Sequence, residues 1–369
     1  MNGIKIELWD VVQFNKAQEE WSNLLEHSNS DKLFMSWEWL HSWWEIFANS
    51  DEYALQIFAA YNIDGDLVGL APLFLLPAKS KKIIKTQRLQ FIGNCWRGAV
   101  TMRTELQDFI TDKSCSKDVI KSLLLHINTL SNWDEFVFSD LDKSSQTYQI
   151  LMNDNLLDNA YYRYAEDCDS YSLSLDSSFD EYCKSLGKNT RLKFYNRRKL
   201  LDKEGRIKLI EDNNDIEKCF SILNELHIQR WGKPIFEDTR LAFNLKVASL
   251  MASKGQLNFS ILLLDDSPIS IQYNYVVDKH EYNIQAGFNE NFHNKISLGY
   301  LHFGYAIESA FKKGLSCYDF LAGEGKNTQY KKRLTGSSIT IASIQVIRKP
   351  LAKILYRLYD IYNGLVSSS

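Results

Sequence analysis

Residues 257–334 limit the possible fold of this chain more than any other part of it. Three extended runs come first, at residues 257–264, 269–277 and 281–288. The first two are separated by Asp265-Asp266-Ser267-Pro268, whose acidic, small and proline residues favour a hairpin turn. We therefore predict three successive strands here, the first two of them forming a hairpin.

A glycine-bearing loop and a helix follow these strands. A polar loop leads into Ser297-Leu298-Gly299, and residues 300–313 have the apolar spacing of a helix that ends at Gly314. A short strand is predicted at residues 317–321. The open amino end of a helix presents unpaired N–H groups and a partial positive charge. This order of elements therefore provides a seat for a phosphate or pyrophosphate.

This block resembles the second half of a GNAT-type acyltransferase domain, in which coenzyme A lays its pyrophosphate on such a helix start. More narrowly, it is similar to the CelD/BcsL-type acetyltransferases found with polysaccharide biosynthesis genes, which are relatives of the Fem-type peptidoglycan amino-acid transferases. The match covers residues 170–345 well and the earlier part more loosely. It rests on Ser297-Leu298-Gly299, the run from Tyr318 to Glu324, Tyr330-Lys331, His227, Arg230-Trp231 and the basic segment 188–199.

The resemblance implies acetyl-CoA or another acyl-CoA as the donor, bound by Ser297, Leu298, Gly299, Tyr330 and Lys331. The usual glycine-rich signature of the wider family is reduced here to residues 294–299. An acyl carrier protein or an aminoacyl-tRNA therefore stays open as the donor. The acceptor is expected to bind through four further side chains, Arg191, Arg230, Trp231 and Arg333.

Three side chains are candidates for catalysis. Asp319 stands in an apolar strand and must either face a cleft or be paired in the core. Glu324 lies between two glycines on a loop that can approach a ligand. His227 is able to take a proton from an amine or hydroxyl, although a lone histidine on an apolar helix face is more often structural.

The reaction expected from these residues is direct attack of the acceptor on the thioester. It needs a base and a backbone N–H for the oxyanion, and it requires no metal. The sequence lacks a Gly-x-Ser-x-Gly elbow and has no convincing cysteine–histidine pair. We therefore predict an N- or O-acyltransferase, most simply an acetyltransferase, acting on a cell-envelope sugar, small or lipid-linked, or a related metabolite. Its rivals are a Fem-type transferase using tRNA and a non-catalytic binding subunit of polysaccharide assembly.

Two basic stretches have more than one interpretation. Residues 188–199 hold six cations and either line a groove for phosphates or for the acidic helix of a carrier protein, or form a solvated face. Nucleic acid is disfavoured, because the net charge of -3 is negative and no recognition module is present. Residues 348–365 form a basic amphipathic helix that either lies on an anionic membrane or docks on the protein itself.

The first half of the chain repeats the plan of the second. Strands are predicted at residues 54–61 and 67–76 around an Asp-Gly turn, with a further strand, a helix and a strand following. The tryptophan-rich helix after Ser36 is interpreted as a core helix, with an aromatic pocket as the alternative. In the first half the loop at residues 93–117 replaces the helix start of the second. We interpret this half as a degenerate copy.

The predicted fold class is α/β with two tandem lobes, each a mostly antiparallel mixed sheet flanked by helices. The predicted limits are 1–165 for the first lobe, 166–347 for the second and 348–369 for the terminal helix. Six scattered cysteines, the absence of a signal-peptide pattern and the lack of a long apolar run lead us to expect a cytoplasmic protein, with peripheral contact at the inner membrane face left open.

Overall fold

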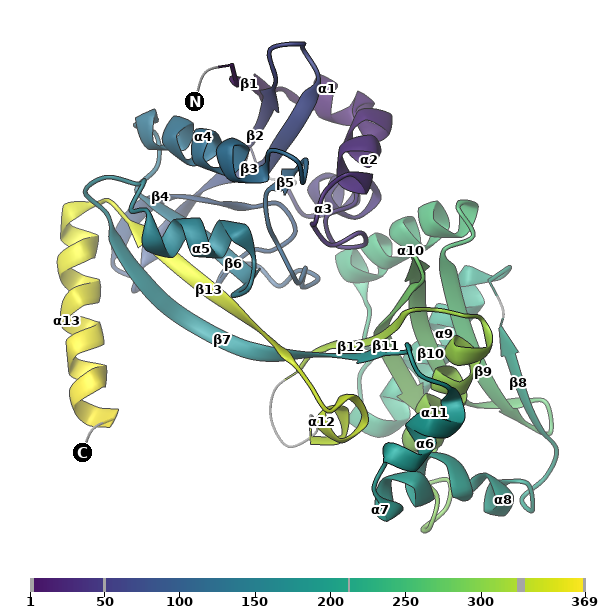
Figure 1. Ribbon diagram of the computed structural model, residues 1–369. Helices are drawn as coiled ribbons and strands as arrows, with labels where there is room; N and C mark the ends of the chain where they lie inside the picture. The colour runs from purple at the N-terminus through teal and green to yellow at the C-terminus, as the bar shows by residue number, and fades with distance from the viewer. Residues whose placement is uncertain (1–2, 49–50, 212, 324–328, 368–369) are drawn as a thin grey trace. The chain divides into compact units, whose positions relative to one another are not determined.

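The computed structural model describes residues 3–48, 51–211, 213–323 and 329–367, together with the side chains of all of these except 364–367. The chain forms two compact units (Figure 1). Residues 1–168 and 340–369 belong to the first unit, and residues 169–339 belong to the second. Strand β7 (Tyr161–Ser174) passes from the first unit into the second.

The first unit is built on a mixed sheet with the strand order β1-β2-β3-β4-β6-β13-β7, in which the short β5 pairs with β3. Its strands and helices in chain order are β1 (Lys5–Trp9), α1 (Val11–Lys16), α2 (Gln18–Glu26), α3 (Trp37–Phe47), β2 (Ala54–Tyr61), β3 (Leu67–Ser80), β4 (Ile84–Phe91), β5 (Ile110–Thr111), α4 (Ser116–Thr129), β6 (Glu135–Asp142), α5 (Gln146–Asn153), β13 (Ile339–Ile347) and α13 (Pro350–Ser367).

Helices cover both faces of this sheet. Helices α4 and α5 bury one face in a cluster that includes Leu73 and Leu123. The next residue along β3, Phe74, points to the opposite face because side chains alternate along a strand. There it contacts Trp43 of α3, with ring centroids 5.4 Å apart. Ser36 caps α3, and Trp37, Trp39 and Trp43 are buried, so the interpretation as a core helix is confirmed.

The second unit has the strand order β7-β12-β11-β10-β9-β8. Its elements after β7 are α6 (Phe179–Ser185), α7 (Lys188–Arg191), the π-helix η1 (Leu192–Asn196), α8 (Arg198–Leu201), β8 (Ile207–Glu211), α9 (Ile216–Trp231), α10 (Asp238–Ser253), β9 (Leu257–Leu264), β10 (Ser267–Val277), β11 (His280–Phe288), α11 (Leu298–Lys312), β12 (Cys317–Ala322) and α12 (Gln329–Thr335).

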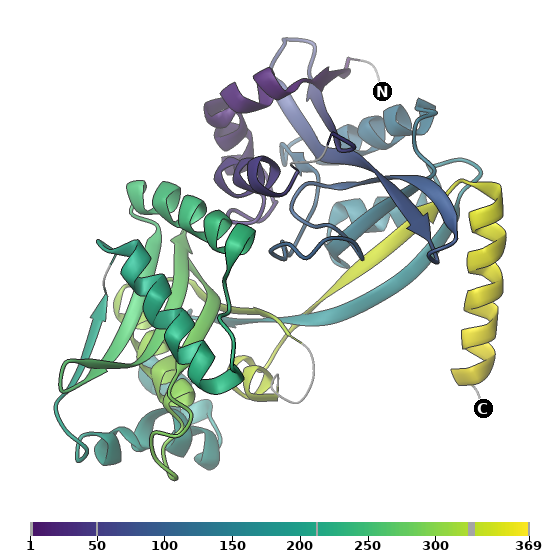
Figure 2. The same ribbon diagram turned by 180° about the vertical axis from the view of Figure 1, so that it is seen from behind.

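The two faces of the second sheet differ in chemistry. Figure 2 shows α9 in front of the strands, where Phe220 meets Phe259 and Tyr273 edge to face. On the opposite face, the side chain of His302 in α11 lies between the hydroxyls of Ser260 and Ser270, at 3.0 and 2.7 Å. Because His302 is fully buried, its pKa falls to about 3, and the ring is neutral at pH 7.

Both units contain the same strand irregularity. In each, a parallel pair of strands is joined over only three residue pairs, β4 with β6 and β11 with β12. In each, the second of these strands then bulges against its other neighbour, β13 or β7. The bulges contain Asp140 and Leu321, with φ of 52° and 59°, a left-handed conformation uncommon for residues with a side chain. A shared strained bulge indicates that one plan occurs twice.

The end of the chain differs from the predicted domain limits. Residues 340–347 were assigned to the second lobe, but β13 pairs antiparallel with β6 in the first unit. The terminal helix α13 likewise belongs to the first unit rather than forming a separate part. Among the described helices, none combines the length and apolar character that crossing a bilayer requires.

Candidate functional site

Helix α11 begins without a side-chain cap. The N-terminal residues of five other helices, Asp10, Ser36, Ser145, Ser178 and Asp215, each accept a backbone N–H through their side chain. Ser297 makes no such bond among the described residues. Helices α2, α4 and α10 also lack a side-chain cap, so the missing cap does not by itself identify an anion site, and the phosphate site at the start of α11 stays a prediction.

The strands beside this helix start separate. Pairing of β11 with β12 covers Tyr282↔Asp319 and the two pairs before it, and no further pair occurs in the described part of the chain. Beyond that point Ile284 forms a bulge in β11, since Tyr273 pairs with Gln285 and Asn274 with Asn283. The facing edges of β11 and β12 thus open on the side where β11 ends and α11 begins. Bulges and unpaired edges of this kind are frequent next to ligand sites.

Aromatic rings line the region between the helix start and the end of β12. Tyr330 of α12 has its ring centroid 5.6 Å from those of Tyr300 and Phe303 in α11, and it meets Phe320 of β12 edge to face. Burial raises the pKa of the Tyr330 phenol above its usual value of 10, so it keeps its proton. The structure therefore brings Tyr330 together with the first turns of α11.

Lys331 holds the end of β12. Its ammonium donates to the carbonyls of Phe320, Leu321 and Ala322, at 2.6, 3.0 and 3.0 Å. Carbonyl oxygens accept hydrogen bonds from a charged donor, so the positive charge is fixed at this strand end. Arg333, two residues further on, is exposed on α12.

The structure places Asp319 away from the helix start. Its Oδ2 lies 3.2 Å from Nε2 of His280, and its Oδ1 accepts the N–H of Leu321 at 2.6 Å. Asp319 pairs with Tyr282, six residues before the end of β11, which corresponds to about 20 Å along an extended strand. Asp319 is therefore paired within the core, which was one of the two alternatives given by the sequence, and its partner His280 was not predicted. Glu324 lies outside the described residues.

Arg230 approaches the helix start through Phe288. Its guanidinium lies 4.7 Å from the centroid of the Phe288 ring and forms an ion pair with Glu290 at 3.0 Å. The same ring fills the space beside Gly299, where an added Cβ would come within 2.6 Å of it. Gly299 is thus required by the close approach of β11's last residue. A cation stands next to the predicted anion seat.

His227 lies one helical turn before Arg230 on α9. Its Nδ1 is 2.7 Å from the carbonyl of Lys233. A carbonyl can only accept, so Nδ1 carries the proton and Nε2 keeps a lone pair for use as a base. Trp231, the last residue of α9, is 56% exposed. His227, Arg230 and Trp231 therefore share one end of α9.

The basic segment divides into paired and unpaired cations. Arg198 is bound to Glu308 and stacked on Tyr305 at 3.8 Å, so it is structural. Arg191, the last residue of α7, donates to the carbonyl of Cys183 at 3.4 Å. Lys193 in η1 lies 5.7 Å from the centroid of the Tyr300 ring and so faces the first turn of α11. The groove interpretation therefore fits Lys193, which was not singled out from the sequence.

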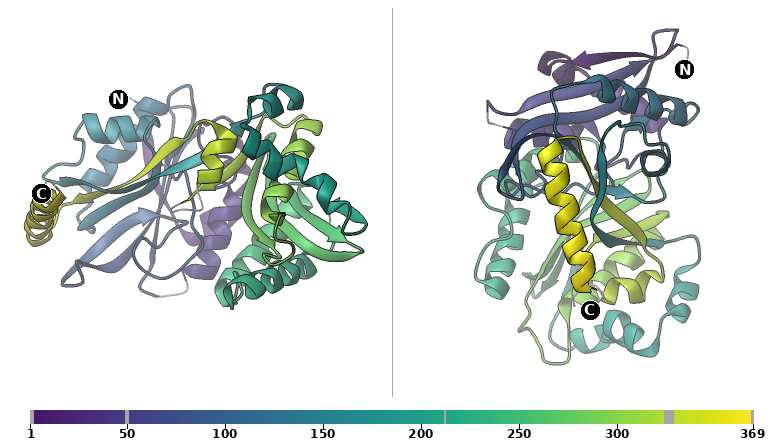
Figure 3. Two further views of the ribbon diagram at one scale, coloured as in Figure 1. Left: turned by 90° about the horizontal axis from the view of Figure 1, so that it is seen from below. Right: turned by 90° about the vertical axis from the view of Figure 1, so that its left-hand side faces the viewer.

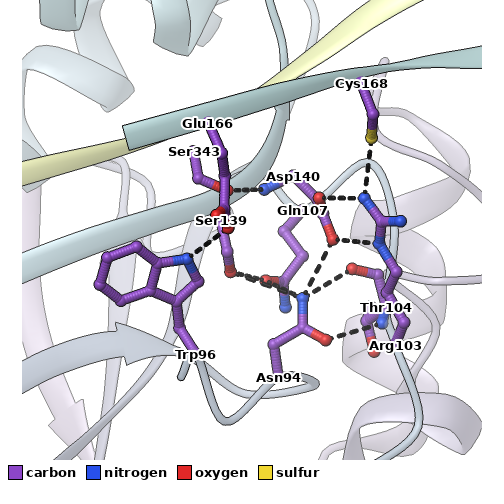
Figure 4. Close-up of polar contacts among 10 residues, drawn as sticks. All are labelled: Asn94, Trp96, Arg103, Thr104, Gln107, Ser139, Asp140, Glu166, Cys168 and Ser343. Carbon is purple, nitrogen blue, oxygen red and sulfur yellow. Dashed lines mark hydrogen bonds and ion pairs between the residues drawn. The ribbon is translucent and has the colours of Figure 1, made fainter. Parts of the chain in front are cut away.

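The matching opening in the first unit is closed by buried side chains. Asn94, in the loop that replaces the helix start, donates to Ser139 and Asp140 of β6 at 3.5 and 3.4 Å (Figure 4). Its backbone carbonyl accepts from Gln90 of β4, so Asn94 connects both strands. Arg103 completes the closure through two bonds to Asp140, at 2.8 and 2.7 Å.

Comparison with known proteins agrees with this geometry. Residues 188–332 match the family model described as an acetyltransferase (GNAT) domain, so the second unit is similar to a GNAT-type domain. The crystal structure of FemX superposes with a TM-score of 0.61 at 12% identity, covering 94% of this chain and 99% of that one. No curated protein sequence matches the chain.

Two further solved structures have the same arrangement. A tandem GNAT protein from the clavulanic acid biosynthesis pathway gives a TM-score of 0.52 at 10% identity, over 94% of this chain and 99% of that one. L-PGS from Bacillus licheniformis gives 0.50 at 13% identity, over 92% and 95%. At these identities the likeness establishes the fold, and the predicted α/β fold of two tandem GNAT-like lobes is confirmed.

Proposed function

We propose that the chain is an acyltransferase whose second unit binds acyl-CoA, most simply acetyl-CoA, with the diphosphate at the start of α11. The observation that carries this proposal is the uncapped N-terminus of α11 beside the separated edges of β11 and β12. Two cations lie near that helix start, Arg230 over the ring of Phe288 and Lys193 over the ring of Tyr300. The match of residues 188–332 to a GNAT domain supports the same assignment.

In this proposal the pantetheine chain enters between the separated strands. Its amides pair there with the edge of β11 in place of a partner strand, and a backbone N–H of that edge donates to the developing oxyanion. The acceptor nitrogen or oxygen attacks the thioester carbon, the carbon–sulfur bond breaks, and coenzyme A leaves as a thiolate that accepts a hydrogen bond from the phenol of Tyr330. The Nε2 atom of His227 takes the proton of the acceptor.

The proposed acceptor is an amine or hydroxyl of a cell-envelope sugar or a related metabolite. The support for this class is the sequence resemblance of residues 170–345 to the CelD/BcsL-type acetyltransferases, together with Arg230 and Trp231 at the end of α9. Arg191 and Arg333 are proposed to contact the outer parts of the acceptor.

The test is calorimetric binding of acetyl-CoA by the full chain and by Ser297→Asp. An aspartate at this position caps α11 with its own carboxylate, which stabilises the helix by about 0.5–1 kcal/mol while competing with the diphosphate. Loss of one to two charge-assisted bonds, at roughly 1.5–3 kcal/mol each, weakens binding by at least about tenfold. Binding falls while the melting temperature stays equal or rises.

Ser145→Asp is the matched control, because Ser145 caps α5 in the first unit and the charge change is identical. It should leave acetyl-CoA binding unchanged. If the wild-type chain does not bind acetyl-CoA at millimolar concentration, the coenzyme A assignment is wrong. A carrier-protein or aminoacyl-tRNA donor would then be tested at the same helix start.

A further inference from the structure

Helix α13 has two apolar sides, and only one of them is packed. Ala352 and Tyr356 are buried against Ile347 of β13, and Asp360 on the same side forms an ion pair with Arg163 at 2.8 Å. This inward side fixes the helix on the first unit. The structure therefore confirms that the helix docks on the protein, which was one of the two interpretations of the basic tail.

The other side of α13 is an apolar stripe in contact with solvent. Leu351, Ile354, Leu358, Ile361 and Tyr362 follow the spacing of one helix face and are each between 57% and 66% exposed. Figure 3 shows this helix lying in front of the strands of the first unit in the right-hand view. A continuous stripe of large apolar side chains is uncommon on a free surface and indicates a contact.

Cations border this stripe. Lys353 and Arg357 directly precede Ile354 and Leu358 on the helix and lie along one edge of it. On the other edge, the ammonium of Lys81 lies 2.9 Å from the centroid of the Tyr359 ring. Positive charge beside an outward apolar stripe is the arrangement of helices that lie in the surface of an anionic bilayer.

The β3–β4 hairpin adds both features at its tip. Lys81 and Lys82 have φ of 48° and 64°, in a tight turn where asparagine and glycine are the residues that fit without strain. Ile83, the next residue, is 75% exposed. Its neighbour Ile84 packs on Tyr356, so the tip lies beside α13. Two lysines in strained positions indicate that charge is needed there.

A basic cavity of about 850 Å³ opens between this hairpin and the residue before α13. Lys79, Lys82 and Lys85 line it and have no ion-pair partner within the described part of the chain. Lys349 lies on the opposite wall, bound to Asp134 at 3.2 Å. Glu52 and Asp134 also line the cavity, but the cations outnumber these two carboxylates, and this excess of positive charge favours a phosphate group over a neutral ligand.

We propose that the stripe of α13, the hairpin tip and the basic cavity together dock the first unit on an anionic phospholipid surface. The stripe enters the boundary between headgroups and acyl chains, and the cavity receives a headgroup phosphate. A second copy of the chain fits the same surface less well. Self-contact of the stripe would bring Lys353 and Arg357 towards their own copies, and like charges repel. The inference goes beyond acyl transfer and does not depend on it.

The experiment is co-sedimentation of the full chain with vesicles of phosphatidylcholine alone or mixed with phosphatidylglycerol. Wild type should bind the anionic vesicles at least about tenfold more tightly than the neutral ones. Leu358→Glu should reduce anionic binding by at least about tenfold, because it places a charge in the stripe. Ile63→Glu is the matched control, since Ile63 is 86% exposed on a turn of the same unit, and it should bind as wild type.

The charged part is tested by Lys82→Glu combined with Lys85→Glu, against Lys117→Glu on α4 as a surface control. The double variant should lose the preference for phosphatidylglycerol, and the control should keep it. Equal melting temperatures establish that each variant is folded. Absence of vesicle binding by wild type, or unchanged binding by Leu358→Glu, would overturn the proposal. So would a solution dimer that Leu358→Glu converts to a monomer without any vesicle binding.

Discussion

The ion pair between His280 and Asp319 predicts an alkaline-sensitive element inside the second unit. The imidazole stacks on Tyr282 with centroids 4.2 Å apart, and its Nε2 lies 3.2 Å from the Asp319 carboxylate. Burial lowers the pKa of His280, but hydrogen bonds to Asp319 and to Cys317 outweigh this and raise it to about 10. The perturbation is Asp319→Asn, which keeps an acceptor for the N–H of Leu321 and removes the charge.

The magnitude follows from the size of the shift. A rise of the His280 pKa from 6.5 to about 10 corresponds to at most ~5 kcal/mol of extra stabilisation of the protonated form over the neutral form. The His280 side chain is 29% exposed, so solvent screening reduces this to ~2 kcal/mol. Because the folded pKa is the higher one, the stabilisation is fully present below pH 6.5. It is lost as the pH rises from 6.5 towards 10.

The assay is NMR of protein labelled at histidine, with His280→Gln assigning the resonance. In wild type the His280 signal should titrate near pH 10, and in Asp319→Asn near or below 6.5. Between pH 7 and 9, unfolding by urea should show wild type losing its advantage over Asp319→Asn. A wild-type midpoint near 6.5, or parallel stability curves for the two proteins, would refute the reasoning.

Two further predictions concern α11. Gly304→Ala should destabilise the second unit by about 1–3 kcal/mol, since the new Cβ would lie 2.0 Å from the carbonyl oxygen of Phe194. Calorimetric melting measures this, with Gly187→Ala as the control because its Cβ would meet nothing within 4 Å. Equal melting temperatures of the two variants would contradict the prediction. His302→Gln should reduce acid sensitivity, because the depressed pKa of about 3 gives stability above pH 6.5 that is lost as the pH falls towards 3. Urea unfolding at pH 7 and 5 measures the slope, and an unchanged slope would refute the assignment.

Local patterns predicted the core of the second unit well. The hairpin at residues 257–277 and the strand and helix that follow it were predicted from alternating apolar residues, turn-forming residues and the glycine that ends the helix. Each of these signals lies within a few residues of the element that it predicts. The structure extends α11 by two residues at its start, to Leu298, and places Arg230 beside Gly299 through Phe288. That contact joins residues about seventy positions apart, and no local pattern contains it.

The partner of Asp319 and the sheet that residues 340–347 join were not predicted, because both depend on which strands pair. The partner of Asp319 depends on the parallel register that sets Cys317 opposite His280, and this register appears only when the strands pair. The assignment of residues 340–347 was wrong for a similar reason. The alternating apolar pattern of β13 predicts a strand but not which sheet that strand joins. Its partner β6 lies about two hundred residues earlier in the sequence.

The difference between the two units follows from the cost of leaving backbone groups unpaired. Both separate a parallel strand pair after three residues, so both expose edges that need partners. In the first unit Asn94 and Gln107 fill this region from the loop itself: Gln107 donates to the carbonyl of Ile92, just beyond β4, at 2.8 Å, and Ser139 of β6 donates to Gln107 at 2.6 Å. A filled opening of this kind has no room for an acyl chain. In the second unit the described loop residues supply no such plug, and Lys331 of α12 binds the carbonyls of Phe320 and Leu321 in β12. An amide-bearing ligand placed between β11 and β12 would satisfy the remaining edge, which is why the open copy is the one that we propose to be active.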